Sequence, residues 1–366
     1  MKNSKLLFGF CAAVLITFLV GYMLDINRKQ SAGKQIVVTQ FVFENDAKLS
    51  TGSTETPESI SAPTPKLGKD GKPKVDLFMA LITAPVRLDR RMANRETWLT
   101  TLKNYPNVAM RFFTDAKGWD ESIKANITEE RKKYGDLEFI PTSNGYWYGH
   151  RYMWMLFWAF EHYDFNFFLK TDDDYFVCLN NLANDLQYRK NEKYLYWGWL
   201  GCDPSMVAMD SGLLILGKDL ASEFVKRNDT LLCHPMAGQM IAMFINKLEA
   251  EKYDVTYFAD NSRLVHYRSH LKDRLNNKLC SNLIGIHQAY PKHMREYWSF
   301  AKDSWYNETF PKVERKPYSE YCSRPKGWDW RVLGSFWKHE PKPCWAPDTD
   351  WPELHKYKMH KGREDE

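Results

Sequence analysis

The sequence has little excess charge and no block of basic residues. Its 366 residues include 51 lysines and arginines against 46 aspartates and glutamates, which gives a formal net charge of +5. No Lys/Arg-rich stretch interleaved with aromatic residues is present, so nothing in the charge pattern indicates nucleic acid as a partner. With 44% hydrophobic and 27% charged residues, the composition is that of a chain that folds around a core, and wholesale disorder is excluded.

Long apolar runs are absent except for one near the N-terminus. Residues 6–24 (LLFGFCAAVLITFLVGYML) carry no charge, and about 20 such residues span a bilayer as a helix. The flanking charges are nearly balanced and do not fix the orientation. A cleaved signal peptide is the alternative, but the run is longer than a typical h-region and no A-x-A-like cleavage site follows it. We therefore predict a retained signal anchor, and with either interpretation the rest of the chain enters the secretory pathway.

A polar linker follows the apolar run. Residues 50–66 (STGSTETPESISAPTPK) are rich in Ser, Thr and Pro, and such a segment cannot bury enough apolar surface to fold. We predict a cytoplasmic tail over residues 1–5, the anchor over 6–24, and a stem or linker over 25–74. A globular domain then begins at residue 75. This layout is typical of a single-pass type II membrane protein whose folded domain is luminal.

Cysteine pairs at zinc-binding spacing are also absent. Six of the seven cysteines lie beyond the anchor, and none shows the C-x-x-C spacing. An even number in an oxidising compartment predicts disulfides, but six cysteines allow fifteen connectivities and the sequence does not choose among them. Three sequons for N-glycosylation, at Asn126, Asn228 and Asn307, also lie beyond the linker, in agreement with a luminal domain. The six cysteines are Cys178, Cys202, Cys233, Cys280, Cys322 and Cys344.

The globular part alternates short apolar runs with stretches of helical periodicity. Such alternation predicts βα units and an α/β fold with a mostly parallel central sheet covered on both faces. No internal repeat is present. The predicted strands are 76–82, 108–114, 137–140, 166–170, 194–200 and 212–216, and the predicted helices are 88–102, 119–134, 148–163, 219–227 and 237–248.

Aromatic residues are abundant, at 15% of the chain with 14 tryptophans. The cluster at 146–158 predicts a core helix, because aromatic stripes at helical spacing usually face a core. Sugar stacking in an acceptor groove is the alternative interpretation, and Trp197 and Trp199 are open to the same two interpretations. Residues 301–366 are loop-rich and hold six of the tryptophans, and we predict that they pack onto the domain as a C-terminal extension.

Three adjacent aspartates follow one of the predicted strands. Asp172, Asp173 and Asp174 come directly after the strand at 166–170. In open α/β sheets, ligands bind beyond the carboxyl ends of the strands. Adjacent carboxylates repel one another, and a hard divalent cation such as Mg²⁺ or Mn²⁺ offsets that repulsion best. A metal site that binds a nucleotide donor through its diphosphate is therefore predicted, and the alternative is a solvated loop in which Asp174 caps a following turn.

Four segments of the sequence, in the right order, resemble the β-1,3-galactosyltransferase (hexosyltransferase) family, which is related to the fringe and core-1 enzymes. The more specific segments are FFLKTDDDYFV at 167–177 and TAPVRLDRRMANRETWL at 83–99. DSGLLILGKDLA at 210–221 and IGIHQAYPKHMREYW at 284–298 are the other two. The resemblance covers roughly residues 76–300, and it implies a GT-A-like nucleotide-sugar-binding domain over residues 75–300.

The resemblance also implies an activity and a compartment. The expected reaction is the metal-dependent, inverting transfer of Gal, GlcNAc or GalNAc from a UDP-sugar to a glycan hydroxyl, with a β-1,3 linkage. The expected acceptor is a glycan on a glycoprotein, a glycolipid or a proteoglycan. The expected location is the Golgi membrane, with the catalytic domain in the lumen.

The resemblance assigns site residues by motif position. Asp172, Asp174 and His287 would hold Mn²⁺ or another divalent cation, although a lone histidine is otherwise more often a structural residue. Thr83, Asp172 and Asp173 would lie at the donor nucleotide, with Asp172 facing the ribose. Arg91 and Arg95 lie four residues apart on one predicted helix face. They would reach the donor diphosphate, or else form a solvated basic face.

One part of the family's pattern is missing. An inverting transfer needs a base to take the proton of the acceptor hydroxyl, and the family usually supplies it from an acidic block before a late helix. Ala237 and Gly238 stand at the corresponding positions, and no carboxylate lies between Asp229 and Glu249. Either Asp210 substitutes as the base, or the protein is a non-catalytic relative that binds glycan or nucleotide in a lectin-like or chaperone-like role. The intact aspartate triplet favours an enzyme.

Overall fold

The computed structural model describes residues 66–67 and 71–354, apart from residues 144, 204–205, 306–309, 311, 336 and 347–348. The predicted tail, the anchor, most of the linker and the sequon at Asn307 therefore lie outside the described residues. Among the helices of the described part, none is both long and apolar enough to cross a membrane. The described residues belong to one unit of the chain, Ile60–Glu366.

The centre of this unit is an eight-stranded sheet with the strand order β10-β7-β8-β5-β2-β3-β4, in which β1 pairs with β2. The pairs β2–β3, β2–β5, β3–β4 and β7–β10 are parallel, whereas β8 runs antiparallel to both β5 and β7. The predicted α/β fold with a mostly parallel sheet is thus confirmed, as a mixed sheet. The strands are β1 (Lys66–Leu67), β2 (Pro73–Ile82), β3 (Val108–Lys117), β4 (Leu137–Ser143), β5 (Asp164–Asp172), β7 (Leu195–Asp203), β8 (Met206–Gly217) and β10 (Thr256–Ala259).

The strand β2 is apolar on both of its faces because helices cover both faces of the sheet. Phe78 and Ala80 belong to one buried cluster, and Leu77 and Met79, which point the opposite way, belong to another. A strand that is buried on both faces cannot alternate apolar and polar residues. This is why the continuous apolar run in the sequence predicted a buried strand.

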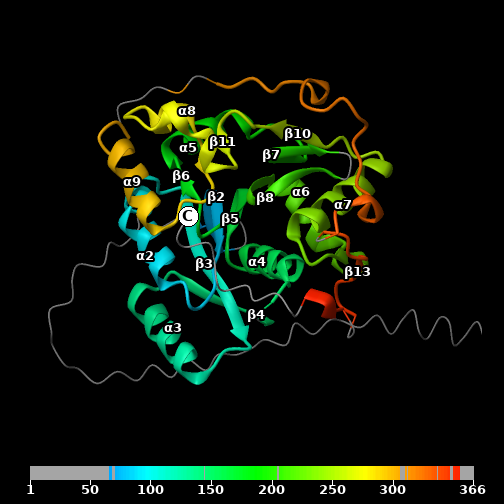
Figure 1. Cartoon of the computed structure of the whole chain (residues 1–366), viewed down its shortest axis with the longest axis horizontal. Helices are drawn as coiled ribbons and strands as arrows, with labels where there is room; N and C mark the ends of the chain where they lie inside the picture. The colour runs from blue at the N-terminus through cyan, green and yellow to red at the C-terminus, as the bar shows by residue number, and fades with distance from the viewer. Residues whose placement is uncertain are drawn as a thin grey trace, which may run out of the picture. The chain divides into compact units, whose positions relative to one another are not determined.

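The helices form two layers, one on each side of the sheet (Figure 1). The helices α4, α6 and α7 contribute side chains such as Tyr152 and Phe224 to the first buried cluster, and α2, α5, α8 and α9 contribute to the second. Tyr152 is fully buried, so the aromatic segment 146–158 is confirmed as a core helix. The helices are α2 (Leu88–Glu96), α3 (Glu121–Tyr134), α4 (Tyr148–His162), α5 (Leu179–Arg189), α6 (Lys218–Lys226), α7 (Ala237–Ala250), α8 (Leu279–Asn282) and α9 (Pro291–Ala301).

A small second sheet joins parts of the chain that lie about 90–110 residues apart. Its order is β11-β12-β6, with β11 (Leu264–Val265), β12 (Gly285–Ile286) and β6 (Phe176–Val177). The strand β12 is antiparallel to β6 and parallel to β11. Since β6 begins two residues after the aspartate triplet and β12 ends just before His287, this pairing carries His287 to the end of β5.

The predicted disulfides are present, and two of them join the segment beyond residue 301 to the rest of the domain. The bonds are Cys178–Cys280, Cys202–Cys322 and Cys233–Cys344. Beside the last of these, β13 (Lys342–Pro343) pairs antiparallel with β9 (Leu232–Cys233). Each bond closes a loop of more than 100 residues, and closing long loops removes much conformational entropy from the unfolded chain.

This pairing leads to a prediction about the C-terminal segment. The double variant Cys233→Ala/Cys344→Ala removes a loop closure of 111 residues and should lower the free energy of unfolding by about 2–5 kcal/mol. Thermal unfolding of the variant and of the native chain measures the loss. Peptide mapping without reduction should recover the three pairs above from the native protein. Recovery of a different pairing, such as Cys202 with Cys233, would contradict the described arrangement.

Candidate functional site

The aspartate triplet lies at the carboxyl end of β5, in the middle of the main sheet. Asp172 is the last residue of β5 and is paired in register with Ile82 at the end of β2. The residues that follow the two strands are also in contact: the Thr83 hydroxyl donates a hydrogen bond of 2.6 Å to the Asp173 carboxylate. The triplet therefore occupies the place where ligands bind in an open α/β sheet.

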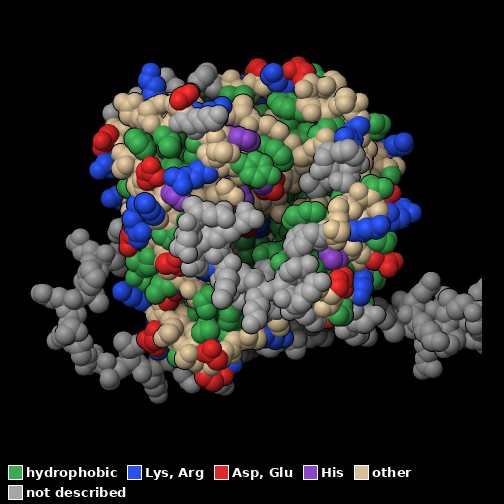
Figure 2. Space-filling view, in the orientation of Figure 1, with side chains coloured by type: hydrophobic (Ala, Val, Ile, Leu, Met, Phe, Trp, Pro, Cys, Tyr) green, Lys and Arg blue, Asp and Glu red, His purple; other side chains and the backbone are tan. Residues whose placement is uncertain are grey.

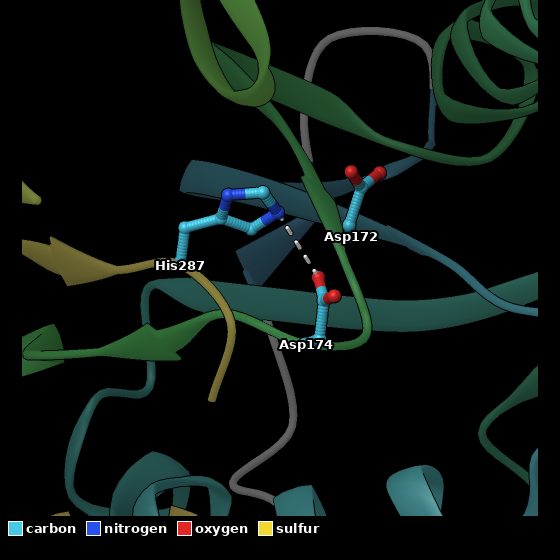
Figure 3. A group of neighbouring side chains, drawn as sticks. All are labelled: Asp172, Asp174 and His287. Atoms are coloured by element: carbon cyan, nitrogen blue, oxygen red, sulfur yellow. Dashed lines mark ion pairs between the residues drawn. The ribbon is translucent and has the colours of Figure 1, made fainter. Parts of the chain in front are cut away.

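Asp172, Asp174 and His287 come together at this end of the sheet. One ligand atom from each of the three side chains lies within 4.8 Å of the others. Figure 3 shows the ring of His287 directed at the Asp174 carboxylate, with Asp172 beside them. The ring of His287 stacks on that of Tyr175, with the centroids 4.8 Å apart. The three residues that the sequence predicted as metal ligands are thus neighbours in the fold, although they come from segments more than 100 residues apart.

The orientation of His287 is fixed by a backbone contact. Its Nδ1 lies 3.1 Å from the carbonyl oxygen of His266, and because a carbonyl only accepts, Nδ1 carries the proton. In the neutral ring this leaves a lone pair on Nε2, which lies 3.6 Å from Asp174 Oδ1. That oxygen is buried and has no hydrogen-bond partner among the described residues. Two acceptor atoms thus face each other, and a cation between them satisfies both.

The chain makes a tight turn directly after His287. Gln288 has a φ of 59°, in the left-handed region that is uncommon for residues other than glycine. The turn lets the Ala289 N–H donate to the carbonyl of Asp174 at 2.8 Å. The backbone therefore ties the segment after His287 to Asp174, while the segment before His287 pairs with β6. Backbone strain of this kind persists only where the surrounding structure enforces it.

Burial makes Asp174 costly to ionise. It raises the pKa of the Asp174 carboxyl to about 6, against the lowering effect of His287 and of Arg90 and together with the charges of Asp172 and Asp173. The residue as a whole is 9% exposed. Arg90 partly compensates, because its guanidinium lies 3.4 Å from Asp174 and 3.0 Å from Asp173. A proton and a metal ion compete for the Asp174 carboxylate. A divalent cation compensates the buried negative charges better than a single proton does.

Asp172 is balanced by a lysine that sequence reasoning did not single out. The ammonium of Lys170 forms an ion pair with Asp172 and donates a 2.7 Å hydrogen bond to the carbonyl of Ser211. Lys170 is buried in β5, while about a third of the Asp172 side chain is exposed. Asp172 is thus the most open carboxylate of the triplet. A lysine directly after the apolar run 167–169 was the signal that could have identified Lys170.

Arg91 and Arg95 donate to partners other than the triplet, and their contact with the donor diphosphate stays a prediction. Arg91 is fully buried and donates to both oxygens of Glu130 at 2.6 and 2.8 Å. Arg95 donates to Glu130 at 2.7 Å and to Asp136. The two arginines do share a helix face, but that face of α2 packs against α3. Arg90, one residue earlier, faces the triplet instead.

Thr83 and Asp173 lie at the same end of the sheet as Asp172, and their contact with the donor nucleotide stays a prediction. Asp173 is buried, and its carboxylate accepts hydrogen bonds from Thr83 and Arg90. Its carbonyl accepts a 2.8 Å bond from the Asn94 side chain. Both predicted donor contacts are therefore already engaged inside the protein. Their role in the fold is to hold the backbone of the triplet between Asp172 and Asp174.

Asp210, the predicted substitute base, lies in the strand β8. The register between β7 and β8 shifts at Trp199, so that residues 210–213 of β8 bulge, and bulges beside active sites commonly re-aim a side chain. Asp210 Oδ1 accepts a 2.7 Å hydrogen bond from the Gly212 N–H. A Cβ atom at Gly212 would lie 2.7 Å from that oxygen and 2.8 Å from the Tyr175 ring, so only glycine fits.

Asp210 belongs to the same site as the triplet. Burial raises the pKa of the Tyr175 hydroxyl well above its ordinary value, and the charges of Asp210, Asp172 and Asp174 add to the effect. The geometry agrees, because a Cβ atom at Gly212 would contact both Asp210 and the ring of Tyr175, the residue that follows Asp174. Asp210 Oδ2 also lies 3.8 Å from Nδ1 of His266, and the ring centroids of His266 and His287 are 5.1 Å apart.

The start of α7, where the family's acidic block is missing, adjoins the same strand. A Cβ atom at Gly238 would lie 3.4 Å from the hydroxyl of Ser211, the neighbour of Asp210. A side chain at position 238 would thus adjoin Ser211, the residue that follows Asp210. His266, like Arg90 and Lys170, was missed by sequence reasoning, although it follows a short apolar strand as His287 does.

Two of the predicted glycosylation sequons lie within the described residues. Asn126 is exposed on α3. Asn228 is half-buried at the start of a short 3₁₀ turn, and its carbonyl accepts a hydrogen bond from Trp345. Glycosylation of both residues stays a prediction.

Residues 89–212 match the family model described as "Galactosyltransferase". Beta-1,3-galactosyltransferase 6 of Mus musculus is 31% identical over 144 residues, which cover 37% of this chain and 44% of that protein. "Probable beta-1,3-galactosyltransferase 12" of Arabidopsis thaliana is 29% identical over 168 residues, covering 41% of this chain and 44% of that protein. The matches thus span less than half the length of these relatives. The resemblance to the galactosyltransferase family is confirmed over this segment.

Solved structures of glycosyltransferases match at low similarity. A glycosyltransferase involved in glycosylation of the major capsid of PBCV-1 aligns with 9% identity and a TM-score of 0.33, over 60% of this chain and 99% of the other. The galactosyltransferase LgtC, in complex with donor and acceptor sugar analogs, aligns with 12% identity and a TM-score of 0.34, over 61% of this chain and 95% of the other. These scores are too low to carry an argument.

The raised pKa of Asp174 predicts how metal binding depends on pH. A cation must displace the Asp174 proton, so affinity falls as the pH drops through about 6. Between pH ~7 and pH ~5 the dissociation constant for Mn²⁺ should rise at least roughly tenfold. Titration of the full chain with Mn²⁺, followed by the EPR signal of the free ion, measures this. An affinity that stays flat over this range would show that Asp174 does not take part.

The buried network of Arg91 and Glu130 predicts an effect on stability. Glu130→Ala leaves the Arg91 charge buried without its partner and should lower the free energy of unfolding by about 3–5 kcal/mol. Glu129→Ala is the matched control on the same helix, because Glu129 is exposed and pairs only with Lys132 at the surface. Urea unfolding of both variants gives the comparison. Equal losses would contradict a structural role for the buried pair.

Proposed function

We propose that this chain, whose residues 89–212 are similar to the galactosyltransferase family, is a metal-dependent glycosyltransferase. It transfers a hexose from a UDP-sugar to a glycan hydroxyl, with inversion and in a β-1,3 linkage. The observation that carries the proposal is the meeting of Asp172, Asp174 and His287 at the carboxyl end of β5. The buried, unpartnered oxygen of Asp174 fits a metal site better than a solvated loop.

The residues around this cluster have separate tasks in the proposed reaction. Asp174 and His287, with Asp172, would hold the cation, and Mn²⁺ suits a set of carboxylate and imidazole ligands. A divalent cation bound there would stabilise the negative charge that develops on the departing UDP. Arg90 lies within 3.4 Å of Asp174 and adds a second positive charge beside the diphosphate.

Asp210 supplies the proposed base. Its Oδ1 is held by the Gly212 N–H, which leaves Oδ2 to accept the proton of the acceptor hydroxyl. As the proton moves to Asp210, the hydroxyl oxygen forms its bond to the anomeric carbon and the bond from that carbon to UDP breaks. Attack from the face opposite to UDP inverts the anomeric configuration, and no other carboxylate stands at the start of α7 to serve instead.

We further propose that the protein works in the Golgi, as a single-pass type II membrane protein anchored by residues 6–24. The three disulfides support an oxidising compartment. The exposed sequon at Asn126 is compatible with a luminal domain. The acceptor class, whether glycoprotein, glycolipid or proteoglycan, is open to screening.

The test is a screen of the full chain with UDP-Gal, UDP-GlcNAc and UDP-GalNAc in the presence of Mn²⁺. We expect UDP release that depends on one donor, on a glycan acceptor and on the metal. Asp174→Asn should abolish metal-dependent UDP binding, whereas Asp303→Asn, at an exposed position of the same charge, should change nothing. If UDP does not bind in a metal-dependent way, the donor site is assigned wrongly.

Asp210→Asn separates catalysis from binding in the same screen. Turnover should fall by roughly 10²–10⁴-fold, the usual contribution of a general base, while metal-dependent UDP binding stays near the native value. Full turnover in this variant would remove Asp210 as the base. UDP binding without turnover by the native chain, across all donors and acceptors, would favour the non-catalytic alternative.

A further inference from the structure

Trp199 and its neighbour Trp197 have different surroundings, although the sequence left the same two interpretations open for both. Trp197 is fully buried and donates a 3.0 Å hydrogen bond to Asp260, so it is a core residue. Trp199 is half-buried at the point where β7 and β8 lose register. Its ring stacks on that of His266, with centroids 4.9 Å apart and an angle of 21° between the planes.

The aromatic rings continue outward from His266. The ring of Tyr267 lies edge-on to His266 at 4.5 Å, and Tyr267 is 48% exposed. Figure 2 shows histidine and hydrophobic side chains together at the surface near β11, on a face that is hollowed near its centre.

The rings of Trp199, His266 and Tyr267 form an aromatic row, and this row begins at the proposed reaction centre. The ring of His266 lies 5.1 Å from that of His287, and its Nδ1 lies 3.8 Å from Asp210 Oδ2. The buried Nδ1 has no hydrogen-bond partner within the described part of the chain. The row thus leads from the proposed metal ligand and the proposed base to solvent. Trp199 belongs to β7 and His266 follows β11, whereas Arg90 belongs to α2.

We propose that Trp199, His266 and Tyr267 form the acceptor subsite, which binds a hexopyranose ring of the acceptor glycan and directs one of its hydroxyls to Asp210. A pyranose ring presents a face of C–H groups that packs on an aromatic ring, and its edge of hydroxyls needs polar partners. Tyrosine and histidine rings offer both an apolar face and a polar edge. This inference rests on the proposed function, because it names the second substrate's place in the same site.

The aromatic row also predicts which hydroxyl compounds the protein accepts as acceptors. The bulge at residues 210–213 and the stacking of Trp199 on His266 set how far a sugar can approach Asp210. An acceptor without an apolar face, such as a short alcohol, would find no such platform. The row therefore favours a cyclic sugar over other hydroxyl compounds.

The test compares binding of glycans with binding of UDP. The full chain, loaded with Mn²⁺ and UDP, is applied to an array of glycans that end in β-linked galactose, N-acetylglucosamine, N-acetylgalactosamine or xylose. We expect Trp199→Ala and Tyr267→Ala each to weaken glycan binding roughly tenfold, and Trp199→Phe to restore most of it. Metal-dependent UDP binding should stay within about twofold of the native value.

A matched control is available for the exposed tyrosine. Tyr188 on α5 is 43% exposed, so Tyr188→Ala removes a similar side chain away from the row and should leave glycan binding unchanged. Once an acceptor is identified by turnover, its KM should rise in Tyr267→Ala and stay unchanged in Tyr188→Ala. Since Tyr267 is at the surface, its loss does not endanger folding in the way that a core substitution does.

Three outcomes would overturn the subsite. Glycan binding that survives both Trp199→Ala and Tyr267→Ala places the acceptor elsewhere. Loss of UDP binding in Tyr267→Ala assigns the row to the nucleotide base of the donor. A native chain that binds UDP with Mn²⁺ but no glycan on the array has no acceptor subsite of this kind. Failure of the proposed function itself appears separately, as the absence of metal-dependent UDP binding in the native chain.

Discussion

Three consecutive carboxylates at the end of a buried strand are the constraint on which the rest of this structure depends. Their mutual repulsion in a site of low solvent access would be costly if all three were left unpaired. The protein gives each a different partner. Asp172 pairs with Lys170, Asp173 accepts from Arg90, and Asp174 keeps one buried oxygen unpartnered opposite His287. The last arrangement is the one that a cation stabilises.

The strand pairing of the two sheets brings these groups together. The parallel pairing of β2 with β5 places Thr83 beside Asp173. The small sheet of β6, β12 and β11 carries His287 and His266 from distant segments to the same point. On the far side of α2, Glu130 of α3 holds the two arginines that do not face the site. The helix that presents Arg90 is thereby fixed in orientation.

The sequence predicted the sheet and its helical layers, because strand and helix periodicity are local properties. The resemblance to a known family predicted that Asp172, Asp174 and His287 come together. The sequence did not predict which arginine of α2 faces the triplet. Spacing shows that Arg91 and Arg95 share a helix face, but it does not show which element packs against that face. In the structure that element is α3, through Glu130. The bulge that aims Asp210 depends on the register of β8 against β7. The disulfide pairing depends on contacts across more than 100 residues, which no local pattern encodes.

The central claim is that Asp174 and His287 are held together for a divalent cation that binds a nucleotide diphosphate. The most direct measurement is a crystal structure of the full chain grown with Mn²⁺ and UDP, with diffraction data collected near the manganese absorption edge. We predict one strong anomalous peak between Asp174 and His287, in contact with the diphosphate oxygens. A structure in which UDP is bound and no anomalous density lies between these two residues would contradict the account.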